Sequence, residues 1–246
     1  MRIVEIISHC WQYSRVLNYQ LSSLVLNPPK RVKVSLAVVF TPDDKPTSEC
    51  LARFVSSSWP VDTLMDVQRF MSRVPKASLL NRSIYRNHLA KTTAADVVWF
   101  ADCDYVFGEG CLDALADVPL DPADPDYSPL YFPRVTLFSK DHATGDEYAR
   151  RVEEFGLYDI DPADFIEHRP RRAIGGIQIV PGDVARAKGY CPDNPKWQTP
   201  TDGDKMLFGS DVPFRRSLGT GGKAVEIPNC YRIRQTTEGV VDTLEA

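Results

Sequence analysis

The sequence predicts an α/β protein with a mainly parallel central sheet and helices on both of its faces. Apolar segments of strand length alternate with helical segments through the first half of the chain, which is typical of βαβ units. Residues 32–40 form a near-continuous apolar run, the mark of a strand that is covered on both faces. A second run, residues 97–101, ends in Asp102-Cys103-Asp104. Strands of this kind require helices on each side of the sheet.

Each element of the first half is indicated by a local pattern. Residues 2–8 alternate and are rich in Ile and Val, so we expect the first strand there. A helix is expected over residues 13–26, because Leu17, Leu21 and Leu24 share one face, and Asn27-Pro28-Pro29 ends it. The other expected elements are a helix capped by Ser48 and running to residue 55, a strand over residues 62–71, a helix over residues 79–92 and a strand over residues 96–101.

The second half has a different texture. Residues 119–129 are rich in Pro and Asp and indicate a loop, and residues 141–170 are polar with a weak helical pattern. The other expected elements are strands over residues 130–139, 173–180, 224–227 and 231–234, helices over residues 181–188 and 202–218 (with a break near Gly209), a Pro-rich loop over residues 193–201 and a frayed tail from Thr236. The change near residue 120 separates two functional halves, residues 1–118 and 119–246, of one domain.

Composition restricts the class of protein. A chain of 246 residues with 43% hydrophobic residues can bury a sizeable core. The net charge of -4 gives no support to a nucleic-acid surface that works by bulk electrostatics, although it leaves a local basic groove open. The six cysteines show no Cys-x-x-Cys spacing, so we expect reduced, mostly buried thiols in a cytoplasmic protein. We expect neither a signal peptide nor a transmembrane segment.

Asp102 and Asp104 are the candidate metal ligands. Ligands of open α/β sheets bind at the carboxyl ends of the strands, and both aspartates follow a strand there. Two carboxylates at this place form a hard, all-oxygen site that suits Mg²⁺ or Mn²⁺ carrying a substrate diphosphate. The alternative is a pair of turn aspartates that cap the next element.

Several motifs together resemble a known family. In order and spacing they are similar to glycosyltransferases of the GT-A fold, closest to the family-2-like and galactosyltransferase-like enzymes, over roughly residues 1–235. The resemblance implies a single Rossmann-like domain, with a nucleotide-sugar-binding half followed by an acceptor-binding half. The motifs are Leu17-Asn18-Tyr19, Leu21-Ser22-Ser23-Leu24, Arg86-Asn87, Asp102-Cys103-Asp104, Gly175-Gly176, Gly182-Asp183, Gly189-Tyr190, Gly209-Ser210-Asp211 and Phe214-Arg215.

The resemblance implies a donor site for a nucleotide-sugar, preferably a UDP-sugar. Asp104 would bind the divalent metal, and Asp102 would contact the ribose, the metal through water, or both. A cation is needed there because the nucleoside diphosphate leaves with growing negative charge. The other implied contacts are His9 and Trp11 at the nucleobase, Asp43 or Asp44 at a uracil-type ring, Arg82 and Arg86 at base or phosphate (or as a solvated basic face), and Gly175-Gly176 at the donor sugar (or as a β-bulge).

The resemblance also implies an acceptor side. Asp211 matches the general base of inverting enzymes, which takes a proton from the acceptor hydroxyl. Its alternative is a helix N-cap, since Ser210-Asp211 precedes Val-Pro-Phe. Asp202 and Asp204 are the fallback candidates for the base. Trp197 would form an acceptor wall or, equally, anchor a half-buried loop.

The late histidine that often completes the metal site of such enzymes is absent, because Gln235 follows Tyr231-Arg232-Ile233-Arg234. Arg232 and Arg234 could supplement the metal's charge on the diphosphate. His168 with Arg169, Arg171 and Arg172 could clamp phosphate, although a solvated basic run is the commoner explanation.

The sequence thus predicts a glycosyltransferase, and within that class a hexosyltransferase. A nucleotidyltransferase is an alternative, but residues 8–12 lack the glycines of a phosphate loop. A non-catalytic binding module on the same fold is another. A glycan, a lipid-linked sugar, a protein, a small molecule and a modified nucleic acid all stay open as acceptors.

Overall fold

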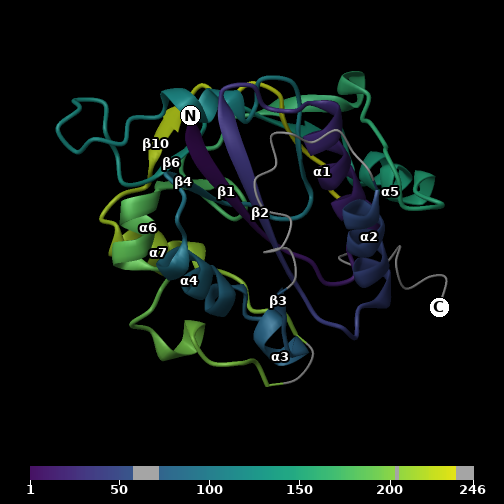
Figure 1. The fold of residues 1–246 in the computed structure, drawn as a ribbon, viewed down its shortest axis with the longest axis horizontal. Coiled ribbons are helices and arrows are strands. Elements are labelled where there is room, and N and C mark those ends of the chain that lie inside the picture. The colour runs from purple at the N-terminus through teal and green to yellow at the C-terminus, as the bar shows by residue number, and fades with distance from the viewer. Residues whose placement is uncertain (58–71, 203–204, 237–246) are drawn as a thin grey trace.

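The computed structural model describes residues 1–57, 72–202 and 205–236, which form two sheets with helices around them (Figure 1). The larger sheet has the strand order β10-β6-β9-β4-β1-β2-β3. Its strands are β1 (Arg2–His9), β2 (Val32–Phe40), β3 (Ser72–Arg73), β4 (Val97–Phe100), β6 (Tyr131–Pro133), β9 (Gln178–Pro181) and β10 (Lys223–Val225).

The central strands of this sheet are parallel, as predicted. β1 lies between β2 and β4 and is parallel to both, and β2 continues parallel to β3. β9 runs antiparallel to β4 and β6, which makes the sheet mixed at that side. Because of this direction, the amino end of β9 lies beside the carboxyl end of β4, with Gln178 paired with Phe100.

Helices cover both faces of the larger sheet, which confirms the predicted architecture. Figure 1 shows α1, α2 and α5 grouped on one side and α4, α6 and α7 on the other. The helices are α1 (Ser14–Leu26), α2 (Lys45–Ser56), α3 (Lys76–Leu79), α4 (Arg82–Thr92), α5 (His142–Arg151), α6 (Gly182–Lys188) and α7 (Asp211–Ser217), with 3₁₀ turns η2 (Asp113–Asp117), η3 (Pro162–Asp164) and η4 (Pro195–Trp197).

A second sheet has the order β5-β11-β7-β8. Its strands are β5 (Tyr105–Phe107), β7 (Thr136–Ser139), β8 (Phe165–His168) and β11 (Cys230–Arg232). β5 starts directly after Asp104 and pairs antiparallel with β11, so the chain leaves the main sheet at the two aspartates and meets its last described strand there.

Several expected elements differ from those observed. The helix expected to start at Ser48 starts at Lys45, because the side chain of Asp44 caps it by accepting from Thr47 N–H. The helix expected over residues 79–92 is α4 and starts only at Arg82, and a separate short helix, α3, ends at Leu79. The strand expected over residues 130–139 is divided at Pro133, where the chain passes from one sheet to the other.

The polar segment 141–170 holds α5 and β8, and of the helix expected over residues 202–218 only α7 is observed. The strand expected over residues 62–71 and the tail beyond Thr236 lie outside the described residues.

Both halves of the chain contribute to one large hydrophobic core, which reaches from Val4 on β1 to Cys230 on β11. A smaller cluster around Tyr19, Tyr148 and Phe165 lies between α1, α5 and the second sheet. All six cysteines are buried and free, as expected. Across residues 1–57, 72–202 and 205–236, the longest apolar helical stretches fall short of what a membrane crossing requires.

Candidate active site

A cavity of about 270 Å³ lies at the carboxyl edge of the central strands. β1 and β4 end side by side there, since Ala101 N–H donates to the carbonyl of Ile7 at 3.1 Å. His9 at the end of β1 therefore faces Asp102 after β4, and both line the cavity. The other lining residues are Tyr13, Arg82, Cys103, Asp104, Tyr105, Phe138, His168, Ile174, Gly175, Gly176, Ile177, Met206, Phe208, Gly209, Asp211 and Arg232.

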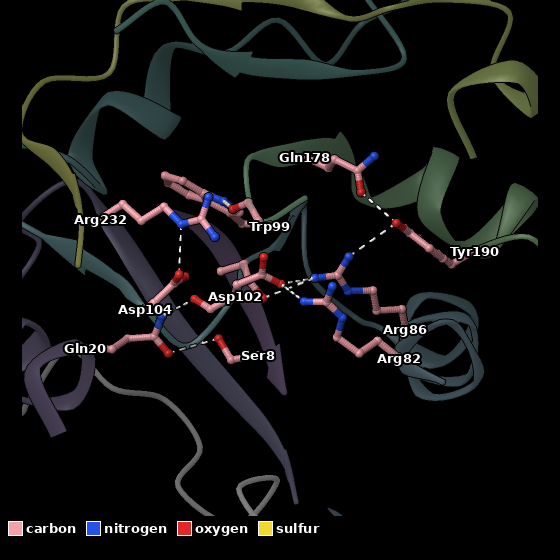
Figure 2. A network of polar contacts seen from close by, with 12 residues as sticks. Ser8, Gln20, Arg82, Arg86, Trp99, Asp102, Asp104, Gln178, Tyr190 and Arg232 are labelled. Carbon is pink, nitrogen blue, oxygen red and sulfur yellow. Dashed lines mark hydrogen bonds and ion pairs between the residues drawn. The ribbon is translucent and has the colours of Figure 1, made fainter. Parts of the chain in front are cut away.

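Asp102 is held by two arginines of α4 (Figure 2). Its Oδ1 accepts from Arg82 at 2.5 Å and from Arg86 at 2.9 Å. The two arginines are four residues apart on one helical face, as the spacing predicts. Burial opposes ionisation of Asp102, but the nearby guanidinium groups outweigh it and lower its pKa to about 2. Asp102 is therefore ionised over the whole physiological range.

Arg82 lines the cavity, whereas Arg86 is buried behind Asp102. Arg86 also donates to Tyr190 Oη at 3.2 Å, and Tyr190 donates to Gln178 Oε1 at 2.8 Å. Figure 2 shows this chain of contacts running from Asp102 to β9. Arg86 is thus built into the protein interior, and the solvated-face alternative does not apply to it.

Asp104 has a different environment. Arg232 Nε donates to its Oδ2 at 2.8 Å, while its Oδ1 is buried and finds no hydrogen-bond partner within the described part of the chain. Burial is the main influence on Asp104 and raises its pKa, although Arg232 opposes the shift. Asp104 is a buried carboxylate with one oxygen left to accept from a ligand.

The β5–β11 pairing brings Arg232 to this place. Tyr105 lies directly opposite Arg232, and Ile233 N–H donates to the carbonyl of Asp104 at 2.9 Å. The guanidinium also lies over the rings of Tyr105 and Phe138, 5.5 and 5.6 Å from their centroids. Asp104 strongly raises the pKa of Arg232, so Arg232 stays charged.

A side chain of α1, Gln20, holds the loop that carries both aspartates in place. The Gln20 side-chain amide donates to the carbonyls of Asp102 and Tyr105, at 3.0 and 3.1 Å. The Ser8 hydroxyl orients that amide by donating to its Oε1 at 2.9 Å (Figure 2). The structure does not support the alternative of two turn aspartates that cap the next element. The carboxylates of Asp102 and Asp104 instead accept hydrogen bonds from arginine side chains.

Gly175 and Gly176 pass close against Asp102. A Cβ on Gly176 would lie 2.5 Å from Asp102 N, and one on Gly175 would lie 3.5 Å from Asp102 Oδ2. Trp99 Nε1 donates to the carbonyl of Gly176 at 2.9 Å and holds the turn in place. Both glycines precede β9, so the β-bulge interpretation is wrong.

Asp211 lines the cavity at the start of α7. Its Oδ2 accepts from Arg215 at 2.6 Å, and in the described structure its carboxylate makes no capping bond to the helix. The N-cap interpretation is therefore wrong for the side chain. Of the fallback residues, Asp202 is exposed and does not line the cavity, and Asp204 lies outside the described residues.

His9 is buried, and neither of its ring nitrogens has a hydrogen-bond partner among the residues described. Burial, with help from Arg86 and Arg82, lowers its pKa well below the usual value. A neutral imidazole at the cavity wall, with both nitrogens unsatisfied, is ready to bond a polar ligand.

Four sequence candidates lie elsewhere. Trp11 is half-buried under the Lys76 ammonium, 4.6 Å from its ring centroid, and Asp43 is exposed; neither lines the cavity. Asp44 is a structural residue, because Thr47 and Gln12 N–H occupy both of its oxygens. Trp197 is only 5% exposed and packs in the core, so the acceptor-wall expectation is wrong and the loop-anchor alternative applies.

In residues 1–57, 72–202 and 205–236, no three His, Cys, Asp or Glu side chains are grouped to hold a metal ion. The unpartnered Oδ1 of Asp104 nevertheless fits a divalent cation that takes its other ligands from substrate phosphates and water, as Mg²⁺ commonly does.

No family model matches the chain, and no curated protein matches its sequence. The fold resembles solved structures at low identity. The mannosyltransferase PcManGT from Pyrobaculum calidifontis, in complex with GDP-Man and Mn²⁺, is 16% identical with a TM-score of 0.45, covering 94% of this chain and 56% of its own. TarS from S. aureus is 12% identical with a TM-score of 0.48, covering 96% of this chain and 59% of its own.

The galactosyltransferase LgtC, in complex with donor and acceptor sugar analogs, is 12% identical with a TM-score of 0.46, covering 92% of this chain and 72% of its own. This chain thus spans little more than half of the first two structures. At such low similarity, the cavity's own chemistry carries the inference about function.

The apolar walls of the cavity were not foreseen. Phe138, Ile174, Met206 and Phe208 line it, and Phe208 is 56% exposed. An exposed aromatic beside a polar cavity is a binding signal, but the sequence does not reveal exposure, because Phe208 simply ends the short apolar run of residues 206–208.

Proposed function

We propose that the protein is a glycosyltransferase that moves a hexose from a nucleotide-sugar, preferably a UDP-sugar, to an acceptor hydroxyl. One observation carries the proposal. A single cavity is lined by the Asp102–Asp104 pair, by Arg82 and Arg232 and by Asp211, at the carboxyl edge of the parallel central strands. These are the groups needed to stabilise a diphosphate leaving group and to accept a proton from an incoming hydroxyl.

On the donor side, the diphosphate would lie between Arg82 and Arg232, whose guanidiniums suit phosphate oxygens. Asp104, with Asp102, would hold Mn²⁺ or Mg²⁺, which when bound neutralises charge on the leaving diphosphate. His9 would bond the nucleobase or ribose through its unsatisfied nitrogens. The base would extend along the ends of β1 and β2 toward Trp11 and Asp43.

On the acceptor side, Asp211 would act as general base. Arg215 fixes its Oδ2 at 2.6 Å, and Oδ1 is left to take the hydroxyl proton. As the acceptor oxygen bonds to the sugar's anomeric carbon, the bond from that carbon to the diphosphate breaks. Gly175 and Gly176 offer the sugar a wall without side chains, and the apolar Met206 and Phe208 would cover it from water.

The two halves of the chain divide these roles in the main. Residues 1–118 carry the donor contacts and residues 119–246 the acceptor contacts, except that Arg232 and the Gly175-Gly176 turn reach back to the donor side. The six free, buried thiols favour a reducing cytoplasm as the place of this activity.

The test combines binding and turnover. We expect UDP or GDP, with UDP preferred, to raise the melting temperature only when Mn²⁺ or Mg²⁺ is present. At a hundredfold excess over Kd the stabilisation is about 2.7 kcal/mol, a shift of a few degrees. Asp104→Asn should abolish the metal-dependent part, and Asp193→Asn, at an exposed position outside the cavity, serves as the control.

A panel of nucleotide-hexoses should then reveal slow hydrolysis of one donor. Nucleotide binding without any turnover of donor would indicate a binding module. Release of pyrophosphate from nucleoside triphosphates would indicate a nucleotidyltransferase. Equal stabilisation with and without chelator would remove the metal from the proposal.

A further inference from the structure

We propose that a second groove, adjoining the candidate active site, binds a phosphate group carried by the acceptor. The groove has a volume of about 490 Å³ and is lined by Arg172, Val212, Arg215, Arg216 and the turn 219–221. The inference rests on the proposed function, since it names the class of acceptor: an alcohol that bears a phosphate ester.

The Asp211–Arg215 ion pair lies between the groove and the first cavity. Asp211 lines the first cavity, and Arg215 lines the groove. Arg215 is fixed from two sides, because it donates to Asp211 Oδ2 at 2.6 Å and to the carbonyl of Ala173 at 2.8 Å. A molecule anchored in the groove therefore extends across this pair toward the carboxylate that would deprotonate its hydroxyl.

The charge of the groove selects an anion. Arg172 and Arg216 are exposed, and neither guanidinium makes a hydrogen bond or ion pair with any residue that the structure describes. The described lining contains three arginines and no acidic side chain. The whole chain carries a net charge of -4 and would repel an anion at long range. The arginines of the groove therefore provide a local positive charge that attracts one.

The turn 219–221 adds neutral donors to the lining of the groove. Thr220 Oγ1 accepts from Gly222 N–H at 3.0 Å, which leaves the hydroxyl hydrogen able to donate to a ligand. Gly221 N–H has no acceptor in the described structure, and Gly221 lacks a side chain that would keep a ligand away. Two unpaired guanidiniums with a hydroxyl and an N–H match the oxygens of a phosphate group, which guanidinium forks bind in bidentate fashion.

The test measures binding without any donor, using inorganic phosphate and glycerol phosphate, the latter a small phosphate ester with free hydroxyls. Calorimetric titration at fixed ionic strength should detect both ligands. Arg172→Gln and Arg216→Gln should each weaken binding about tenfold, and the double variant more. The matched control is Arg53→Gln with Arg150→Gln, which removes two exposed positive charges elsewhere and should leave phosphate affinity unchanged.

A third arm separates free from membrane-bound phosphate. Vesicles of phosphatidylglycerol are compared with vesicles of phosphatidylcholine by co-sedimentation. Binding of glycerol phosphate, lost in the Arg172 and Arg216 variants, supports a free phosphate ester. Binding confined to phosphatidylglycerol vesicles, with the same loss, supports a lipid source of the phosphate.

No binding in any arm, or equal loss in the control, overturns the inference. Metal-dependent binding of UDP is measured in parallel and reports on the first cavity alone. A protein that binds UDP but no phosphate ester retains the proposed function and refutes only the groove. One that binds phosphate at the groove without binding UDP refutes the function instead.

Discussion

Arg232 Nε lies 2.8 Å from Asp104 Oδ2, although 128 residues separate the two in the sequence. The contact joins the end of the main sheet to the last described strand of the second sheet. It places a permanent cation against a carboxylate that burial alone would leave poorly stabilised.

Arg232→Gln should destabilise the protein, because Asp104 would be left buried without its cation. We expect a loss of about 1–3 kcal/mol in the free energy of unfolding, measured by urea denaturation. Arg234→Gln is the matched control, since Arg234 bonds the carbonyl of Ser139 rather than Asp104. Adding Asp104→Asn to Arg232→Gln should recover much of the loss, and a strictly additive double mutant would contradict the pairing.

Asp102 should make the stability of the protein depend on pH in acid. Its pKa is lowered to about 2 in the folded state, from an ordinary 3.8, so its contribution is present above about pH 4 and is lost as the pH falls toward 2. The contribution is about 2 kcal/mol. In chelator, the difference in unfolding free energy between wild type and Asp102→Asn should be constant from about pH 8 to 5 and shrink below about 4. A constant difference throughout would show that the arginines do not stabilise the ionised form.

Gly176→Ala should disturb the Asp102 loop. The added Cβ would meet Asp102 N at 2.5 Å and Tyr105 Cε2 at 2.6 Å, so backbone or ring must move. We expect a loss of about 1–3 kcal/mol in stability and weaker binding of nucleoside diphosphate. Gly156→Ala is the control, since a Cβ there has nothing within 4 Å. Equal melting temperatures for the two variants would mean that the turn adapts freely.

Asp211→Asn should reduce turnover far more than donor binding. The amide keeps an oxygen to accept from Arg215 but cannot take the acceptor proton, so the rate should fall about 10²-fold or more. Donor hydrolysis by water provides the assay until an acceptor is known. Asp202→Asn, at an exposed position outside the cavity, should behave as wild type. Full activity in Asp211→Asn would exclude it as the base.

The sequence predicted well whatever depends on local pattern. β1 and β2 were found within a residue of their bounds, because continuous apolar runs have few alternatives to a buried strand. The placement of Asp102 at a strand end and the shared face of Arg82 and Arg86 followed from spacing alone.

Features that depend on contacts between segments far apart in the sequence were harder to predict. The sequence did not indicate that residues 105–107 form a strand, because their partner, β11, comes more than a hundred residues later. Asp44 illustrates the limit for side chains: its position suggested a ligand contact, but Thr47 and Gln12 N–H occupy it. Trp197 was equally ambiguous, since an aromatic in a loop serves as wall or anchor according to burial.

The β5–β11 pairing also sets the order in which the site is assembled. In the second sheet β5 is an edge strand whose one partner among the described strands is β11, and Arg232 arrives only when that partner docks. A chain emerging from the ribosome exposes Asp102 and Asp104 first and gains the cation for Asp104 last. Asp104 and Arg232 are 128 residues apart, and the chain between them must bring its two ends together before the contact forms. The contact then offsets part of the entropy lost in closing this stretch of chain. The site is therefore complete only after β11 has been synthesised. A chain truncated before β11 lacks Arg232, the arginine that pairs with Asp104.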